Sequence, residues 1–150
     1  MTLREILHSK GHVVHTIGSC ATLEDVVLKL VRNNCGSLVV YDDPGHPDSA
    51  PAGRMIGIIT ERDILKALAT HRKPLATVRV SEVMSSKLVT GSPDDTVEDT
   101  MGLMTELRIR HLPVTEGSQL LGLVSIGDVV KMQHDRLTME NHYLKSYLHG

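Results

Sequence analysis

The sequence has almost no aromatic residues and little cysteine. It contains no Trp, no Phe and only three Tyr among its 150 residues, so the core has to be built from Val, Leu, Ile and Met. Platforms that stack nucleic-acid bases on aromatic side chains are therefore disfavoured. The two cysteines, Cys20 and Cys35, flank an expected helix that holds them roughly 20 Å apart, too far for a disulfide. We expect free, buried thiols in preference to redox sensors.

An excess of one charge and long apolar runs are also missing. Lys and Arg total 16 against 18 Asp and Glu, which gives a formal net charge of −2. A chain with this balance lacks the basic field that holds a nucleic-acid backbone. No apolar run approaches the roughly 20 residues of a membrane span, and the N-terminus has no apolar signal core. We expect neither nucleic acid nor membrane as a partner, and a cytoplasmic or organelle-matrix location.

The dominant feature of the sequence is an internal repeat. Residues 22–27 (TLEDVV) match residues 96–101 (TVEDTM), 74 positions later. Each segment begins with a Thr suited to a helix N-cap and carries an Asp in the first turn, where negative charge is favourable. Apolar residues at helical spacing then predict helices over about 22–34 and 96–107.

Short apolar segments around these helices predict strands, and the order β-α-β-β-α occurs twice. The expected strands cover about residues 12–16, 37–41 and 55–59 in the first copy and 87–90, 111–115 and 120–124 in the second. The first copy has an insertion over 42–53, whose Pro, Gly and Asp content predicts an exposed loop. We therefore predict an α/β (α+β) fold of two pseudo-symmetric repeats packed face to face, with the first repeat and its N-terminal segment in 1–76 and the second in 77–150.

The helix expected from about Ser125 extends well beyond its counterpart in the first copy. Val130, Leu137 and Leu144 recur every seven residues along it, which gives the helix one apolar edge. Such an edge usually needs a partner, so we expect a homodimer. The alternative is that the edge docks onto the same chain.

Thr60-x-x-Asp63 and Ser125-x-x-Asp128 occupy equivalent junctions between a strand and a helix. A capping box alone explains either pattern. Their duplication favours a second interpretation, in which both helix starts border a cleft between the repeats. There, free backbone N–H groups can bind phosphate, and each carboxylate can accept the two hydroxyls of a ribose.

Two further segments carry groups that can bind an anion. Arg110 and His111 begin a strand of the second copy, where the first copy has Gly36 and Ser37. They are either a solvated strand end or a phosphate contact. Lys10-Gly11 and the segment 84–87 (MSSK) precede the first strand of each copy. Taken alone they are ordinary linkers, although they can supply backbone and ammonium donors.

The repeated segments GIITERD (57–63) and GLVSIGD (122–128), with RHLPV (110–114), make the chain similar to a pair of CBS domains, the Bateman module. The resemblance covers about residues 10–131, and it extends to small stand-alone CBS-pair proteins. It implies a cleft between the repeats that binds an adenine nucleotide such as AMP, ADP, ATP or NAD, or S-adenosylmethionine. It also implies association into disc-like dimers.

By position, the resemblance implies that the two Asp residues hold ribose hydroxyls and that the neighbouring hydroxyl residues lie near sugar and phosphate. The basic groups would bind phosphate, and the segments before each first strand would line the adenine. Arg62 is a further candidate for binding phosphate, but the equivalent residue in the second repeat is the neutral Gly127. The resemblance therefore does not imply two equivalent nucleotide sites. The full expected nucleotide-binding set is Lys10, Gly11, Val13, Thr60, Arg62, Asp63, Met84, Lys87, Arg110, His111, Ser125 and Asp128.

Other function classes are less well supported. Ser125, His111 and Asp128 contain the side chains of a catalytic triad, but the sequence has no nucleophile elbow, P-loop or G-x-G-x-x-G motif. We expect no catalysis. His8, His12 and His15 cluster in the sequence, but a strand over 12–15 sends His12 and His15 to opposite faces, so we expect no metal site. The main alternative is a protein-interaction module that regulates a partner protein, with nucleotide binding lost or incidental.

Overall fold

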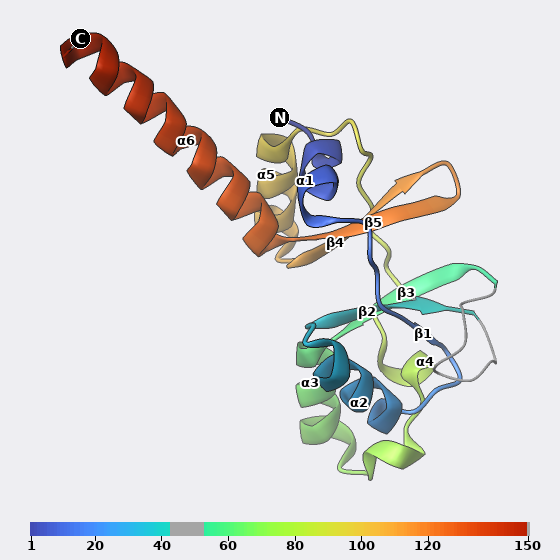
Figure 1. Cartoon of the computed structure of the whole chain (residues 1–150). Helices are drawn as coiled ribbons and strands as arrows, with labels where there is room; N and C mark the ends of the chain where they lie inside the picture. The colour runs from blue at the N-terminus through green and yellow to red at the C-terminus, as the bar shows by residue number, and fades with distance from the viewer. Residues whose placement is uncertain (43–52, 150) are drawn as a thin grey trace. The chain divides into compact units, whose positions relative to one another are not determined.

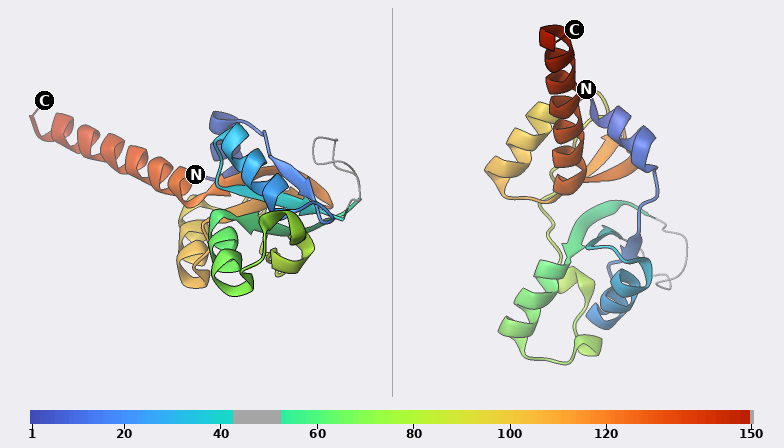
Figure 2. Two further views of the ribbon diagram at one scale, coloured as in Figure 1. Left: turned by 90° about the horizontal axis from the view of Figure 1, so that it is seen from below. Right: turned by 60° about the vertical axis from the view of Figure 1, so that its left-hand side comes forward.

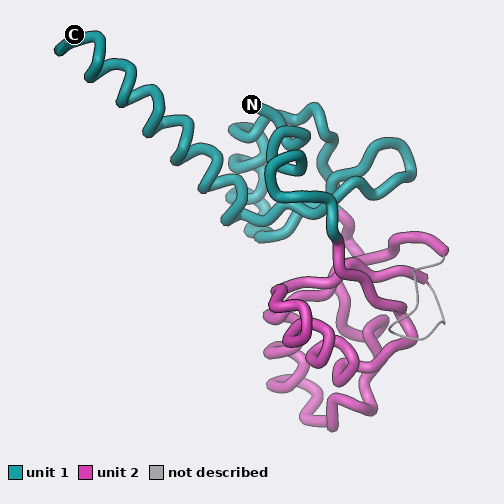
Figure 3. The backbone as a smooth tube through the Cα atoms, in the orientation of Figure 1, with its two compact units in different colours: residues 1–13, 89–150 teal, residues 14–88 magenta. Residues whose placement is uncertain are grey.

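The computed structural model describes residues 1–42 and 53–149 and divides the chain into two compact units. Unit 1 combines Met1–Val13 with Val89–Gly150, and unit 2 is the intervening stretch Val14–Leu88 (Figure 3). The N-terminal segment therefore packs with the C-terminal half of the chain. The division of the sequence into repeats at residues 76 and 77 stays a prediction, because compact units follow packing and not repeat order. Most of the expected loop over 42–53 lies outside the described residues.

Unit 2 is built on a three-stranded sheet (Figure 1). Its strands are β1 (Thr16–Gly18), β2 (Ser37–Tyr41) and β3 (Met55–Thr60), in the spatial order β1-β2-β3. β1 runs parallel to β2 because α2 (Leu23–Asn33) connects them, whereas β2 and β3 are antiparallel. After β3 the chain forms α3 (Glu61–His71), the 3-10 turn η1 (Leu75–Thr77) and α4 (Val80–Val83).

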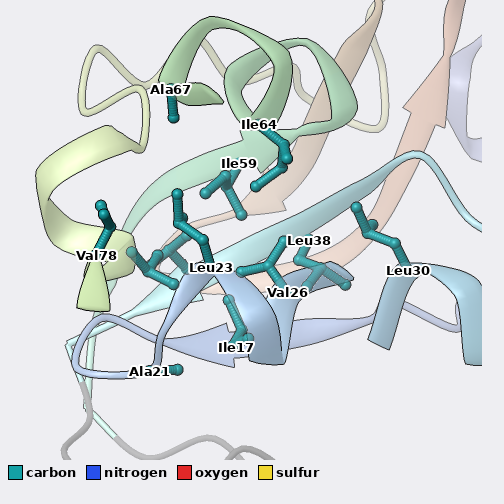
Figure 4. Packing of buried hydrophobic residues seen from close by; sticks show 12 residues of the cluster. Ile17, Ala21, Leu23, Val26, Leu30, Leu38, Ile59, Ile64, Ala67 and Val78 are labelled. Atoms are coloured by element: carbon teal, nitrogen blue, oxygen red, sulfur yellow. The ribbon is translucent and has the colours of Figure 1, made fainter. Parts of the chain in front are cut away.

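The core of unit 2 lies between this sheet and its helices (Figure 4). Leu23, Val26 and Leu30 project from one face of α2, where the i, i+3, i+7 spacing places them. They pack with Leu38 of β2 and Ile59 of β3, both fully buried. All the buried side chains in this cluster are Ala, Val, Leu or Ile, as the composition predicted.

Unit 1 has a two-stranded antiparallel sheet and three helices (Figure 1). The elements are α1 (Leu3–Lys10), α5 (Val97–Leu107), β4 (His111–Glu116), β5 (Gln119–Ser125) and α6 (Ile126–His149). α1 contributes a buried face made of Leu3, Ile6 and Leu7, which completes a core that α5, both strands and α6 share. α1 was not predicted from the sequence, and neither were η1 and α4.

The predicted helix starts are confirmed at Thr22 and Thr96. The Thr22 hydroxyl accepts the Asp25 N–H at 3.2 Å, and the Asp25 carboxylate accepts the Thr22 N–H at 2.9 Å. The Thr96 hydroxyl accepts the Asp99 N–H at 3.1 Å. These caps satisfy backbone donors that a helix start otherwise leaves unpaired.

The four predicted strands that follow the repeated helices are confirmed, with ends within two residues of the prediction. The two strands predicted before those helices are wrong. The strand expected over 12–16 is displaced, since β1 begins at Thr16 and continues to Gly18. The strand expected over 87–90 does not form; the neighbouring Gly91 makes only an isolated bridge to Val114. Both segments have the apolar pattern of a strand, but few of their backbone groups form hydrogen bonds with a neighbouring strand.

Both cysteines are free, as expected. Cys35 is half-buried against the core of unit 2, and burial raises the pKa of its thiol. Cys20 is exposed in the turn before α2, so the prediction of a buried thiol is wrong there. The apolar pattern of α2 begins after the turn and does not cover it.

α6 extends away from the rest of unit 1 (Figures 1 and 2). Its first turns pack on the unit through the buried Val129 and the half-buried Met132, and Arg136 forms an ion pair with Glu98 of α5. From Leu137 to the last described residue every side chain is exposed. None of the helices in the described residues, α6 included, combines the length and apolarity needed to cross a membrane.

Candidate functional site

Each unit contains a strand-to-helix junction with the same set of hydrogen bonds. In unit 2, where β3 meets α3, the Asp63 carboxylate accepts the Thr60 N–H at 2.9 Å, and the Thr60 hydroxyl accepts the Asp63 N–H at 3.4 Å. In unit 1, where β5 meets α6, the Asp128 carboxylate accepts the Ser125 N–H at 2.8 Å, and the Ser125 hydroxyl accepts the Asp128 N–H at 3.1 Å. Both junctions are therefore complete capping boxes.

The caps use only one oxygen of each carboxylate. All of the hydrogen bonds described for Asp63 and Asp128 as acceptors go to Oδ2. Within the described residues, Oδ1 of both side chains accepts none, and each Asp is half-buried. A carboxylate oxygen has two lone pairs, so each junction keeps the capacity to accept hydroxyl groups from a bound molecule.

In unit 1 a lysine joins the junction from the other end of the chain. Lys10, the last residue of α1, places Nζ 2.6 Å from Asp128 Oδ2 and 2.9 Å from the Leu123 carbonyl oxygen. Partial burial by itself raises the pKa of Asp128. The hydrogen bonds from Lys10 and Ser125, with the Lys10 charge, outweigh burial and hold that pKa below its ordinary value. The carboxylate is therefore fixed in its ionised form.

The segment that follows α1 lies along β5, and an equivalent segment lies along β3. His12 Nδ1 is 2.8 Å from the Leu121 carbonyl oxygen in unit 1. In unit 2, Ser85 and Ile58 exchange two backbone hydrogen bonds of 3.1 and 2.9 Å. His12 and Ser85 are not named in the expected binding set, but both lie in the segments expected to line the adenine, and the 74-residue offset relates Ser85 to Gly11.

Gly57 allows the segment in unit 2 to approach β3 closely. A Cβ atom at this position would lie 2.7 Å from the Ser85 carbonyl oxygen and 2.9 Å from the Met84 sulfur. Met84 therefore lies against β3 at Gly57, which is three residues before Thr60 at the end of the strand. It occupies the place in the repeat that Lys10 has in unit 1, so a thioether replaces an ammonium group.

The two junctions also differ in the residues beside the helix start. In unit 1, His111 is the ladder partner of Ser125, and the Ile126 N–H donates to the Arg110 carbonyl at 2.8 Å. In unit 2, Ser37 is paired with Thr60 in the same way. The structure thus brings Arg110 and His111 to the N-terminus of α6, which carries partial positive charge.

Among the described residues, the remaining predicted site residues make no hydrogen bond or ion pair with the carboxylate of Asp63 or Asp128. Gly11 ends α1 with φ of 98°, a conformation that favours glycine. Val13 is 79% exposed, and Arg62 and Lys87 are also exposed. Their part in a binding site stays a prediction.

The geometry also bears on the catalytic and metal alternatives. The Ser125 hydroxyl, the nucleophile that a triad would need, accepts the Asp128 N–H as part of the cap. In the part of the chain that the structure describes, no three His, Cys, Asp or Glu side chains gather as a metal site would require. The groups present at the junctions are able to recognise hydroxyl and anionic groups.

Comparison with known proteins agrees with this architecture. Residues 13–70 and 80–135 each match the family model described as CBS domain. The mitochondrial CBS domain-containing protein CBSX3 of Arabidopsis thaliana is 34% identical over 155 residues, covering 99% of this chain and 72% of the relative. YhcV of Bacillus subtilis, another CBS domain-containing protein, is 32% identical over 121 residues, covering 80% of this chain and 79% of the relative.

Solved structures share both the fold and the sequence pattern. The CBS-domain containing protein ATU1752 from Agrobacterium tumefaciens matches with a TM-score of 0.78 and 33% identity, covering 89% of this chain and 99% of that one. The CBS domain protein NE2398 matches with the same TM-score and 34% identity, covering 89% and 97%. With two tandem copies matched along most of its length, the chain belongs to the CBS domain family, as a CBS-domain pair.

Proposed function

We propose that the chain is a non-catalytic regulatory module that binds an adenine nucleotide, such as AMP, ADP, ATP or NAD, through the junctions at Asp63 and Asp128. The observation that carries the proposal is the contact between Lys10 and Asp128. It joins the segment expected to line the adenine to the carboxylate expected to hold the ribose. The equivalent segment in unit 2 lies against β3 at Gly57.

The chemistry of each junction suits part of a nucleotide. The unoccupied carboxylate oxygens of Asp63 and Asp128 can accept ribose hydroxyls. The N-terminus of α6 and the Arg110 guanidinium suit a phosphate. Met84 offers a polarizable, apolar surface to a base. Because Arg110 and His111 lie at the N-terminus of α6, we propose that unit 1 provides the main phosphate contact.

A structural neighbour supports the class of ligand. The CBS domain pair of protein MJ0100 was solved in complex with 5-methylthioadenosine and S-adenosyl-L-methionine. It shares the fold with a TM-score of 0.74 at 23% identity, covering 91% of this chain and 98% of that chain. Both of its ligands contain adenosine, so S-adenosylmethionine belongs among the compounds to test here.

The module is proposed to act as a homodimer that passes the state of its site to a partner protein. Regulation requires that the ligand bind two states of the module with different affinities. A CBS-CP12 protein from bloom-forming cyanobacteria, 32% identical with a TM-score of 0.70, is hexameric, so assembly occurs among related structures. The proposed location is the cytoplasm or an organelle matrix, in line with the mitochondrial relative.

The test compares Asp63→Asn and Asp128→Asn with Asp25→Asn. Asp25 makes the same capping hydrogen bonds at the start of α2, so Asp25→Asn removes the charge from an equivalent cap without touching either junction. Isothermal titration and thermal unfolding would be measured with AMP, ADP, ATP, NAD and S-adenosylmethionine. A ligand at a hundredfold excess over its Kd stabilises the fold by about 2.7 kcal/mol.

We expect one of these ligands to raise the Tm of the native chain and to bind at least tenfold more weakly to Asp63→Asn or Asp128→Asn. Asp25→Asn should lower the Tm but leave affinity unchanged. Equal effects of the three substitutions on affinity would mean that the two Asp residues only cap helices. A native chain that responds to none of the ligands would contradict the proposal and favour the protein-interaction module.

A further inference from the structure

The exposed part of α6 continues a coiled-coil pattern that starts near the body of unit 1. The pattern alternates steps of four and three residues, which is the heptad spacing of a two-stranded coiled coil. Three of its positions hold Leu, with side chains 54, 61 and 75% exposed at Leu137, Leu144 and Leu148. The complete seam is Val130, His134, Leu137, Asn141, Leu144 and Leu148.

Unit 1 does not cover this seam. α6 packs on the unit through Val129, Met132 and Arg136. At 100° per residue those side chains lie roughly 100° to 160° around the helix from the centre of the seam. All six seam residues are exposed, both beside the unit and along the rest of α6, which extends away from the body of unit 1 (Figure 2).

Charges next to the seam fit a second copy of this chain. With Leu137 and Leu144 at d positions, Glu140 falls at g and Lys145 at e. In a parallel coiled coil, a g residue faces the e residue that lies five positions later on the other helix. Glu140 of each copy therefore faces Lys145 of the other copy, which gives two equivalent ion pairs. Glu140 is exposed and holds Arg136 at 3.2 Å on its own helix, which leaves an oxygen for this pair.

The seam has two polar residues, His134 and Asn141, and Asn141 favours the same arrangement. Asn141 falls at an a position, where two copies in register place their amides side by side. One Asn at an a position fixes register and the two-stranded state in parallel coiled coils, at some cost in stability. Asn141 and the Glu140–Lys145 pair therefore both predict that α6 pairs with α6 of a second copy, in parallel and in register.

We propose that α6 is a dimerisation helix, in which residues 130–148 of two copies form a parallel, in-register coiled coil. The seam is shorter than three heptads, and a free peptide of that length would be marginally helical in water. Here the helix is already nucleated on unit 1 by Val129 and the Arg136–Glu98 ion pair. This interface is independent of the junctions proposed to bind nucleotide.

The first test removes the seam and uses the other apolar stripe of the helix as its control. Met139 and Tyr143 are 59 and 65% exposed but lie well away from the seam around the helix. The mass of the full chain would be measured by light scattering over a range of concentrations. We expect a dimer for the native chain and for Met139→Ser/Tyr143→Ser, and a monomer, or a dimer at least a hundredfold weaker, for Leu137→Ser/Leu144→Ser.

A monomeric native chain would overturn the proposal, as would a dimer lost only in the Met139→Ser/Tyr143→Ser variant. Nucleotide titrations on the same samples keep this inference separate from the proposed function. A monomeric variant that still binds ligand would leave the junctions intact, whereas a dimer without any ligand response would leave the coiled coil intact.

The second test uses exposed charges, which lie outside the core of unit 1. Glu140→Lys and Lys145→Glu should each raise the Kd of the dimer by about fivefold to tenfold at low salt. The double variant should return it to within about threefold of the native value, because both pairs are restored with reversed sign. A double variant as weak as the single ones would overturn the parallel register.

Single cysteines provide a third measurement of orientation. In a background of Cys20→Ser and Cys35→Ala, the substitutions Asn141→Cys and Leu148→Cys would be oxidised separately. An in-register parallel pair brings like a positions within disulfide range, so both variants should form covalent dimers. Crosslinking at one position or at neither would overturn the proposed arrangement, since an antiparallel pair can place only one of the two beside itself.

Discussion

Lys10 and Asp128 are 118 positions apart in the sequence, yet their side chains form an ion pair of 2.6 Å that joins the end of α1 to the first turn of α6. The same ammonium group also donates to the Leu123 carbonyl at the end of β5. Lys10 therefore connects α1 to β5 and to the capping carboxylate of α6. The N-terminal segment is held in unit 1 by this polar contact as well as by its buried apolar face.

This ion pair predicts how stability depends on pH. The folded pKa of Asp128 is lowered, so its contribution to stability is full above the unfolded value of about 3.9 and is lost as the pH falls through the lower folded value. Lys10→Met should raise the folded pKa of Asp128 and lower the free energy of unfolding by about 0.5 to 1 kcal/mol at pH 7, since the pair is partly exposed.

The measurements are an NMR titration of the Asp128 carboxyl and urea unfolding at pH 7 and pH 3. The difference in stability between native chain and Lys10→Met should shrink at the lower pH. Lys87→Met serves as a control, because Lys87 is exposed and makes no described contact with Asp128. An Asp128 pKa that stays the same in Lys10→Met would show that the lysine does not hold the carboxylate in solution.

Gly57 and Gly102 provide a matched pair of glycine substitutions with opposite outcomes. At Gly57 a Cβ would meet the Ser85 backbone oxygen at 2.7 Å, whereas at Gly102, inside α5, it would meet nothing within 4 Å. Gly57→Ala should lower the free energy of unfolding by about 1 to 3 kcal/mol. Gly102→Ala should raise it by about 0.5 to 1 kcal/mol, because Ala has the higher helix propensity.

Chemical denaturation of both variants decides this prediction. Because the segment at Ser85 lies along β3, proton exchange of the Ile58 and Ser85 amides should also speed up in Gly57→Ala and not in Gly102→Ala. A Gly57→Ala protein as stable as the native chain would mean that this segment moves away from β3 without cost.

Local sequence signals predicted the elements that depend on neighbouring residues. The caps at Thr22 and Thr96 are visible because the hydroxyl and the carboxylate that follows lie three positions apart. The capped junctions at Asp63 and Asp128 are visible for the same reason. Each of these arrangements needs only one turn of chain to form.

Features that depend on distant residues could not be predicted in this way. The N-cap residue of α1, Thr2, makes no side-chain cap bond, and the buried face of α1 is stabilised by strands more than 100 residues later. The pairing of Lys10 with Asp128 has no local pattern at all. The strand expected over 12–16 is displaced because its apolar alternation does not show which of its residues can pair with β2. In the structure, the residues that pair with β2 are Thr16–Gly18.

Gln133 predicts a stabilising substitution in α6. Its Oε1 atom is buried and accepts no hydrogen bond from the described residues, and an unsatisfied buried acceptor is costly. Gln133→Met should therefore raise the free energy of unfolding by about 1 kcal/mol, whereas Gln119→Met, at an exposed position of β5, should change it little. Thermal and urea unfolding of the two variants measure the difference. Equal, small effects would mean that water reaches Oε1 in solution.

Arg110 gives a prediction about ligand charge. Its backbone accepts the Ile126 N–H at the start of α6, so its guanidinium and the helix N-terminus can act on the same phosphate. A hydrogen bond to a charged group contributes about 1.5 to 3 kcal/mol. Arg110→Gln should therefore weaken AMP binding by at least tenfold and leave adenosine binding unchanged, because adenosine has no phosphate.

The matched control is Arg108→Gln, which removes the same charge two residues earlier, at the exposed end of α5. It leaves the net charge of the chain equal to that of Arg110→Gln, so any long-range electrostatic effect is the same in both. Titrations with AMP and adenosine at two salt concentrations separate a direct contact from such a general effect. If both variants weaken AMP binding equally, Arg110 acts only through the overall field. If Arg110→Gln also weakens adenosine binding, the side chain supports the shape of the junction and does not contact phosphate.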